Sequence, residues 1–358
     1  MPSKNPLAGL AGRNFLTTDD LTDSELEALL ELAARFKARG PGALLAGRIL
    51  GMVFFNPSLR TRASFEAGMF QLGGHAIDLS VGQGVWKLEH RDGTVMDGDA
   101  AEHLREAVPV LARYCDLLSV RCFPSGKDWA VERTDPILSG FAAYSDVPVI
   151  NMESSLYHPC QALADLLTIR EKLRKTKGKR FLLTWCRHPR ALPTAVPNSA
   201  ALIASRAGMR ITIARPPGFD LDPDIMTRVR ANARKSGGSV EVVDDFEAGF
   251  DGANVVYAKE WGSLDHYGDD AAEKALRARH TDWMVGARQM KRTRDALLMH
   301  CLPVRRNVAL ADEVLDGPWS AVVDEAENRL HAQKALLVAL AGKAGPKAKP
   351  RTSSRARR

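Results

Sequence analysis

Residues 49–62, with the sequence ILGMVFFNPSLRTR, decide the fold of this chain. The first seven residues are apolar on both faces, as in a central strand of a parallel sheet that is covered on both sides. Asn56 and Pro57 then make a turn, and the next five residues begin a helix that carries two hydroxyl and two guanidinium groups. Ligands bind beyond the carboxyl ends of such strands, so this segment predicts both a sheet and a binding site for an anion.

Outward from this segment, strand and helix patterns alternate along the chain, which is typical of α/β folds with parallel sheets. Short apolar runs predict strands near 76–79, 117–120 and 147–150, then at 181–184, 210–214, 240–243, 254–257 and 297–299. Helices are predicted from the capping box at Thr22 to Gly40, over about 159–174, and over about 325–340. The fold class is therefore α/β with two doubly wound parallel-sheet domains, residues 1–150 and 151–341.

The charge of the chain is concentrated at its end. Of 358 residues, 45% are hydrophobic and 26% charged, which are ordinary globular values, and the formal net charge is +7. Seven of the 50 Lys and Arg residues lie from Lys343 onward, which leaves 43 basic and 43 acidic residues in the rest. We expect residues 342–358 to be a disordered basic tail, more plausible as a solubilising appendage than as a polyanion-binding arm, and we expect no nucleic-acid role for the neutral body.

Several classes of site and location are not expected from this sequence. The five cysteines, at positions 115, 122, 160, 186 and 301, form no C-x-x-C pair, so we predict reduced thiols and no metal site. The sequence has no run of about 18 apolar residues, so no membrane span is predicted. The chain begins without an apolar signal segment, so a cytoplasmic location is expected.

Charged or nucleophilic residues follow many of the predicted strands. Arg121 follows the strand near 117–120, Glu153 and the run 158–161 follow the strand near 147–150, Lys259 follows 254–257, and the run 300–303 follows 297–299. Each has a plain structural explanation alone, since His before Pro often begins a helix and Cys at a strand end is often a small buried hydrophobe. Together they predict a cleft for a phosphorylated small molecule.

The strings FFNPSLRTR, GQGVWKLE, HPCQ, VVYAKEW, MHCLPVRRN and EAENRLH, in this order, resemble the transcarbamoylases, and specifically the branch that uses N-acylated ornithine. The resemblance covers about residues 14–341. It implies carbamoyl transfer from carbamoyl phosphate to an N-acylated ornithine, without a cofactor. It also implies that the loop around Pro189, Pro193 and Pro197 belongs to a knotted chain path, whereas proline spacing alone predicts only a stiff, non-helical loop.

The resemblance assigns residues to carbamoyl phosphate. The phosphate would be held by the loop at 58–61, by Arg121, and by Trp86 from the adjacent subunit of a homotrimer, although Trp86 alone would be read as surface packing. The carbamoyl group would contact the HPCQ motif, Arg329, and main-chain carbonyls near Cys301 and Leu302. The full set is Ser58, Leu59, Arg60, Thr61, Trp86, Arg121, His158, Pro159, Cys160, Gln161, Cys301, Leu302 and Arg329, of which Arg60, His158 and Arg329 are the catalytic candidates.

On the acceptor side the resemblance assigns Glu153, Lys259 and Leu302 to the acylornithine. The acetylornithine branch has Glu at the position of Ala101, whereas the succinylornithine branch tends to have Pro there. The acetylornithine branch also tends to have Lys at the position of Ala309, and we draw no functional consequence from that difference. Loss of a carboxylate at 101 removes repulsion toward a succinyl carboxylate. Acetylornithine is the favoured acceptor, succinylornithine the second, and free ornithine ranks lower.

Two other classes of protein remain as alternatives. A nucleotide-dependent dehydrogenase fits a doubly wound fold, but neither G-x-G-x-x-G nor G-x-x-x-x-G-K-[ST] is present. A non-catalytic regulator of transcarbamoylase descent also fits the fold. All the residues that the resemblance assigns to carbamoyl phosphate are present, so we expect turnover.

Overall fold

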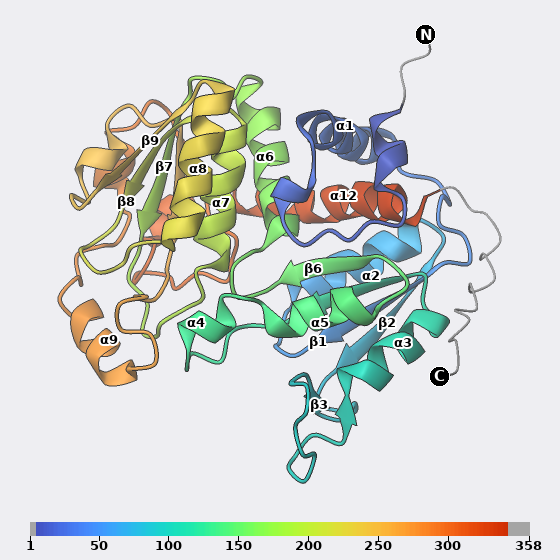
Figure 1. Cartoon of the computed structure of the whole chain (residues 1–358). Helices are drawn as coiled ribbons and strands as arrows, with labels where there is room; N and C mark the ends of the chain where they lie inside the picture. Colours follow the sequence, from blue (N-terminus) through green and yellow to red (C-terminus); the bar gives the residue numbers. More distant parts are fainter. Residues whose placement is uncertain (1–4, 343–358) are drawn as a thin grey trace.

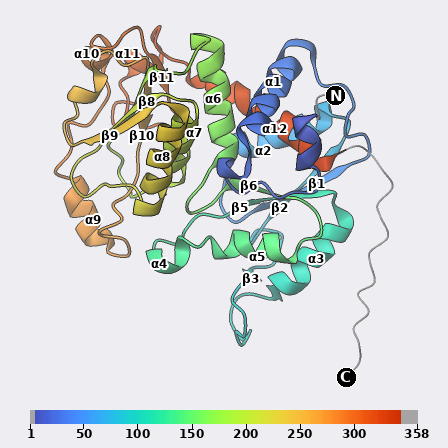
Figure 2. The same ribbon diagram turned by 45° about the horizontal axis from the view of Figure 1, so that its top comes forward.

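The computed structural model describes residues 5–342. Figures 1 and 2 show two bodies, each built on a parallel sheet, that meet along α6 and α12. The expected basic tail from Lys343 onward lies outside the described residues. No helix within residues 5–342 combines the length and apolar character needed to cross a membrane.

The first sheet holds four parallel strands. They are β1 (Ile49–Phe54), β2 (His75–Ser80), β5 (Leu117–Arg121) and β6 (Val149–Glu153), in the order β2-β1-β5-β6. The quoted segment 49–62 therefore supplies a central strand and, through α2 (Arg60–Gln71), the helix that follows it. Helices α1 (Asp23–Arg39), α2 and α12 (Val322–Ala341) cover one face, and α3 (Leu104–Tyr114) and α5 (Pro136–Tyr144) cover the other (Figure 2).

The second sheet holds five parallel strands in the order β11-β10-β7-β8-β9. These are β7 (Arg180–Trp185), β8 (Arg210–Ala214), β9 (Ser239–Val243), β10 (Val255–Lys259) and β11 (Leu297–Met299). Helix α7 (Ala195–Arg206) packs on α8 (Pro223–Ser236) and on α6 (Pro159–Leu173), and α6 also packs on α12 (Figure 1). We propose each sheet with its helices as one domain.

The shorter elements lie in the connections. Strands β3 (Leu88–Glu89) and β4 (Glu102–His103) pair in a segment that projects from the first body (Figure 1). The other short helices are α4 (Trp129–Glu132), α9 (Asp270–Arg277), α10 (Ala287–Met290) and α11 (Asp312–Leu315). The 3-10 turns are η1 (Pro6–Leu10), η2 (Thr18–Asp20) and η3 (Ala248–Phe250).

The predicted α/β class, the parallel sheets and the capping box of α1 are confirmed. The last helix begins at Val322, about one turn before the residue predicted from its pattern. The prediction that Pro197 lies in a non-helical loop is wrong, because Pro197 is the third residue of α7. The first amides of a helix have no partner within the helix, so a proline costs little there.

Candidate active site

A cleft of about 940 Å³ lies where the carboxyl ends of strands from both sheets converge. Its walls come from the segments that follow β1, β5, β6, β10 and β11, from the start of α2, and from α12. This is the position at which doubly wound sheets bind ligands. The cleft brings together Ser58, Leu59, Arg60, Thr61, Arg121, Glu153, His158, Gln161, Lys259, Cys301, Leu302 and Arg329.

The start of α2 presents an anion site to this cleft. Thr61 N donates to the Ser58 hydroxyl over 3.2 Å, which shapes the first turn of the helix. Arg62 also lines the cleft, but its guanidinium group is already in use: it pairs with Asp78, donates to Ser80 Oγ over 2.8 Å and lies 4.0 Å from the centre of the Phe54 ring. Arg60 forms no ion pair or hydrogen bond with any of residues 5–342, so its guanidinium group and the helix-start amides are available to a phosphate.

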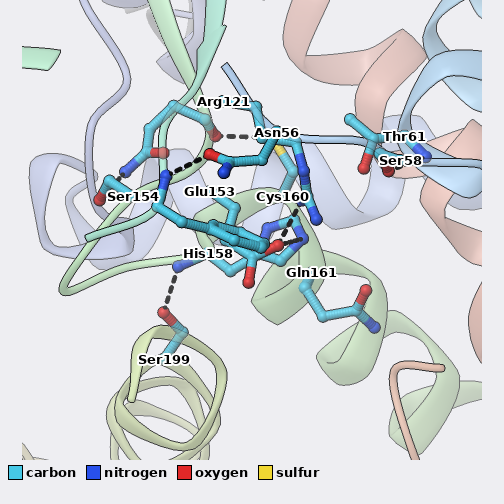
Figure 3. Close-up of polar contacts among 12 residues, drawn as sticks. Asn56, Ser58, Thr61, Arg121, Glu153, Ser154, His158, Cys160, Gln161 and Ser199 are labelled. Atoms are coloured by element: carbon cyan, nitrogen blue, oxygen red, sulfur yellow. Dashed lines mark hydrogen bonds and ion pairs between the residues drawn. The ribbon is translucent and has the colours of Figure 1, made fainter. Parts of the chain in front are cut away.

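Arg121, Glu153 and His158 point toward one another beside this loop (Figure 3). Arg121 forms an ion pair with Glu153, and His158 Nε2 lies 3.5 Å from Glu153 Oε2. Burial, together with the charges of Arg329, Arg121 and Arg60, lowers the pKa of His158 well below its ordinary value. His158 is therefore a neutral imidazole near pH 7, and its Nδ1 is buried without a partner among the described residues.

Gln161 on α6 and Arg329 on α12 line the cleft and contact each other. Arg329 donates to Gln161 Oε1 over 2.8 Å and to Thr61 Oγ1 over 3.2 Å. Gln161 Nε2 donates to Asp165 Oδ1 over 2.8 Å and to Glu325 Oε1 over 2.9 Å. Both amide hydrogens are thus in use, so Gln161 can only accept a hydrogen bond from a ligand.

Asp165 and Glu325 were not among the residues predicted from the sequence. Burial raises the pKa of both carboxyl groups. The charge of Asp165 raises the pKa of Glu325 further, whereas the hydrogen bond between the two groups favours the charged form of Asp165. The available signal was that Asp165 lies four residues after Gln161 on one helix, and that Glu325 lies four residues before Arg329.

The acceptor half of the cleft is formed by Lys259 and the segment after β11. Lys259 Nζ lies 2.9 Å from Glu260 Oε2, and Leu302 N donates to His300 Nδ1 over 2.9 Å. Glu260, which immediately follows Lys259, was also not predicted.

Four predicted residues do not line the cleft. Trp86 is 72% exposed, and Ala101 is also exposed; both belong to the projecting segment near β3 (Figure 1). Pro159 and Cys160 are buried in the first turn of α6, with Cys160 Sγ 3.5 Å from the carbonyl oxygen of Asn151. Within residues 5–342, no group of three or more His, Cys, Asp or Glu side chains has a geometry suited to a metal.

The model of the aspartate/ornithine carbamoyltransferase carbamoyl-P binding domain matches residues 13–171, and that of the Asp/Orn binding domain matches residues 193–340. The chain belongs to the aspartate/ornithine carbamoyltransferase family. The cleft of this carbamoyltransferase thus lies between the parts matched by the two models.

Individual relatives indicate which branch of the family this chain resembles most. An N-acetylornithine carbamoyltransferase from Xanthomonas axonopodis pv. citri is 48% identical over 336 residues, which are 93% of this chain and 98% of the relative. An N-succinylornithine carbamoyltransferase from Bacteroides thetaiotaomicron is 39% identical over 87% of this chain and 92% of the relative. A crystal structure of acetylornithine transcarbamylase complexed with acetylcitrulline is 48% identical, with a TM-score of 0.91 over 92% of this chain and 100% of the other.

Proposed function

We propose that this carbamoyltransferase transfers the carbamoyl group of carbamoyl phosphate to the side-chain amine of N-acetyl-L-ornithine. The products are N-acetyl-L-citrulline and phosphate, in arginine biosynthesis. The observation that carries the proposal is the convergence of Arg60, Arg121, Arg329 and neutral His158 on one cleft, with Lys259 at its other side. The similarity to an N-acetylornithine carbamoyltransferase supports the choice of acceptor.

The arrangement suggests how the reaction proceeds. Helix-start amides and Arg60 hold the phosphate, while Arg121 and Arg329 place positive charge beside the carbamoyl group. The neutral amine of the acceptor attacks the carbonyl carbon, and the carbonyl oxygen gains charge that His158 and the guanidinium groups stabilise. The new C–N bond forms, the C–O bond to phosphate breaks, and the departing phosphate takes the proton of the amine.

On the acceptor side, we assign Glu153 and Lys259 different tasks. Lys259 offers an ammonium group to the carboxylate of the acylornithine. Glu153 forms an ion pair with Arg121 in the free protein. Once carbamoyl phosphate competes for that guanidinium group, the Glu153 carboxylate can accept a hydrogen bond from a donor on the ligand. Main-chain groups at Cys301 and Leu302 line the space between the two substrates.

The function is tested by measuring citrulline-type product from carbamoyl phosphate with three acceptors in parallel. We expect turnover to be fastest with N-acetyl-L-ornithine, slower with N-succinyl-L-ornithine, and slowest with ornithine. Absence of product with all three acceptors would favour the non-catalytic regulator.

The rate of carbamoyl transfer is expected to rise with pH. Only the neutral amine attacks, and the imidazole of His158 stays uncharged because its pKa is lowered, so loss of a proton from His158 does not oppose the rise. The single-turnover rate should increase between about pH 6 and 9 and level off where the bound amine is deprotonated. A flat profile over this range contradicts the proposal that neutral amine is the nucleophile.

Succinylornithine remains a second candidate because Ala101 carries no charge. We propose Ala101 as a position that sets the acyl group, and we expect Ala101→Glu to lower kcat/KM for succinylornithine relative to acetylornithine by about 10-fold, since like charges repel. Ala101→Gln is the matched control of equal size without charge. Equal loss in both variants, or no loss in Ala101→Glu, contradicts a charge-based role.

We propose a homotrimer in which Trp86 completes the cleft of a neighbouring subunit, as its exposure in the single chain suggests. Trp86→Ala should lower kcat/KM for carbamoyl phosphate by about 10-fold, through loss of one hydrogen bond to a charged group. Sedimentation equilibrium gives the oligomeric state. Mixing Trp86→Ala with Arg60→Ala subunits should restore part of the activity if sites are shared, and should restore none if they are not.

We propose the cytoplasm as the location of the enzyme. All five cysteines are free thiols, which is usual where disulfides are kept reduced. Disulfide-linked species in protein isolated without reductant would contradict this proposal.

A further inference from the structure

We propose that Glu260 is a positioning residue that fixes the ammonium group of Lys259 against the carboxylate of the acylornithine. This inference rests on the proposed function, in which Lys259 binds that carboxylate. Glu260 itself does not line the cleft, so it acts through Lys259.

One oxygen of Glu260 holds two partners. Oε2 lies 2.9 Å from Lys259 Nζ and 3.1 Å from His300 Nε2, and all three side chains are buried, with Glu260 only 1% exposed. The direction of the His300 contact follows from its other nitrogen, since Nδ1 accepts from Leu302 N over 2.9 Å. The ring proton therefore lies on Nε2, which donates to Glu260.

This arrangement joins two separate parts of the acceptor half of the cleft. Lys259 ends β10, whereas Leu302 follows β11, and both line the cleft. The chain of contacts Lys259–Glu260–His300–Leu302 N therefore holds an ammonium group and a main-chain segment in one relative position. His300 N also donates to Glu325 Oε2 over 2.9 Å, which connects the chain to the Gln161 network.

The charge of Glu260 also favours the protonated state of Lys259. Burial alone would lower the pKa of Lys259, but the nearby groups Glu260, Cys301 and Glu153 together outweigh it and raise that pKa above the ordinary value, with Glu260 the largest of the three. Without the Glu260 carboxylate, less negative charge opposes the effect of burial, so the lysine loses its proton more easily. The other charged or titratable groups near Lys259 come from the ends of β6, β7 and β11 and from the loop after β7: Glu153, Cys186, His188, His300 and Cys301.

A merely structural ion pair would predict lost stability without a change in how ligand binding depends on pH. The two roles are separated by an acceptor analogue that has no amine. N-acetyl-L-norvaline carries a carboxylate as its one group that titrates in water, and that group stays ionised at neutral and alkaline pH. Its affinity in the presence of carbamoyl phosphate, measured by calorimetry, therefore reports the charge of the protein's cation.

We expect the wild-type dissociation constant to change little between about pH 7 and 9.5, since Lys259 stays charged. In Glu260→Gln, affinity should fall about 10- to 100-fold, with the larger loss at the higher pH, as an uncharged amine replaces the ammonium. Glu260→Asp keeps an anion and should restore the pH-independent behaviour. Glu25→Gln, which removes a buried, ion-paired carboxylate outside the cleft, is the matched control and should bind the analogue as wild type does.

His300→Asn provides a second test that does not depend on the folding of Glu260→Gln. Asn can accept from Leu302 N in place of Nδ1 but cannot reach Glu260, so we expect a loss of about 3- to 10-fold in affinity for the analogue. Thermal unfolding and carbamoyl phosphate binding establish that each variant is folded.

The inference is overturned if folded Glu260→Gln binds the analogue as wild type does, or loses the same factor at both pH values. If Glu260→Gln does not fold, wild-type affinity in His300→Asn overturns it. If wild-type protein transfers carbamoyl groups and these variants bind the analogue as it does, the proposed function stands and only this inference is overturned. Wild-type protein that neither binds the analogue nor transfers a carbamoyl group overturns the function first, and the inference with it.

Discussion

Arg60→Ala is expected to lower kcat/KM for carbamoyl phosphate by about a thousandfold, the loss of two charge-assisted hydrogen bonds to a phosphate dianion. Arg121 and Arg329, the two other arginines that we assign to carbamoyl phosphate, already have partners. Arg121 pairs with Glu153, and Arg329 donates to Gln161 and Thr61. Arg60 has no such partner within residues 5–342, so of these three guanidinium groups it is the one most completely available to the ligand.

Three measurements separate this role from loss of structure. Arg60→Lys keeps the charge but not the bidentate geometry, and its kcat/KM should be only about 10-fold below that of wild type. Arg62→Ala should have a smaller effect than Arg60→Ala, because Arg62 pairs with Asp78 and stacks on Phe54. Carbamoyl phosphate should raise the melting temperature of wild type but not of Arg60→Ala. An equal rise in both would contradict the assignment of Arg60 to the phosphate.

Much of this site could be predicted because the residues follow strands. Arg60, Arg121, Glu153 and Lys259 each lie at or just beyond the carboxyl end of a parallel strand, and the topology of such sheets brings these ends together. Recognising apolar runs such as residues 49–55 was therefore enough to place charged side chains at one cleft.

The residues behind the cleft could not be placed in this way. Gln161 contacts Glu325 across 164 positions in the sequence, because α12 packs on α6. Periodicity predicts both helices but not which side chains meet between them. Glu260 presents the same difficulty. A charged residue after a strand is usually solvated, whereas Glu260 is buried and contacts His300, which lies 40 positions further along the chain.

The segment that carries Trp86 and Ala101 presents a different limit. Its two short strands pair with each other and not with either main sheet, so the fold of one chain does not bring these residues to its own cleft. The roles that we propose for them require a neighbouring subunit, and the subunit-mixing experiment tests that requirement directly.

His158→Ala is expected to lower kcat by about 100- to 1,000-fold, while the affinity for carbamoyl phosphate changes far less. His158 lines the cleft, and its neutral ring can offer one N–H group to the carbonyl oxygen of a ligand. The contact should strengthen as the carbonyl oxygen gains charge, so the loss falls on kcat. Single-turnover rates and calorimetric binding of carbamoyl phosphate measure the two quantities separately.

The pH dependence then distinguishes a neutral hydrogen-bonding group from an acid. A histidine that had to be protonated would lose activity as the pH rises through its pKa. Because the pKa of His158 is lowered, the ring is already neutral throughout the assay range, and the profiles of wild type and His158→Ala should be parallel between about pH 6 and 9. Profiles that diverge in this range would show that His158 titrates during catalysis, and the role of a neutral donor would then be wrong even if the loss in kcat is as large as expected.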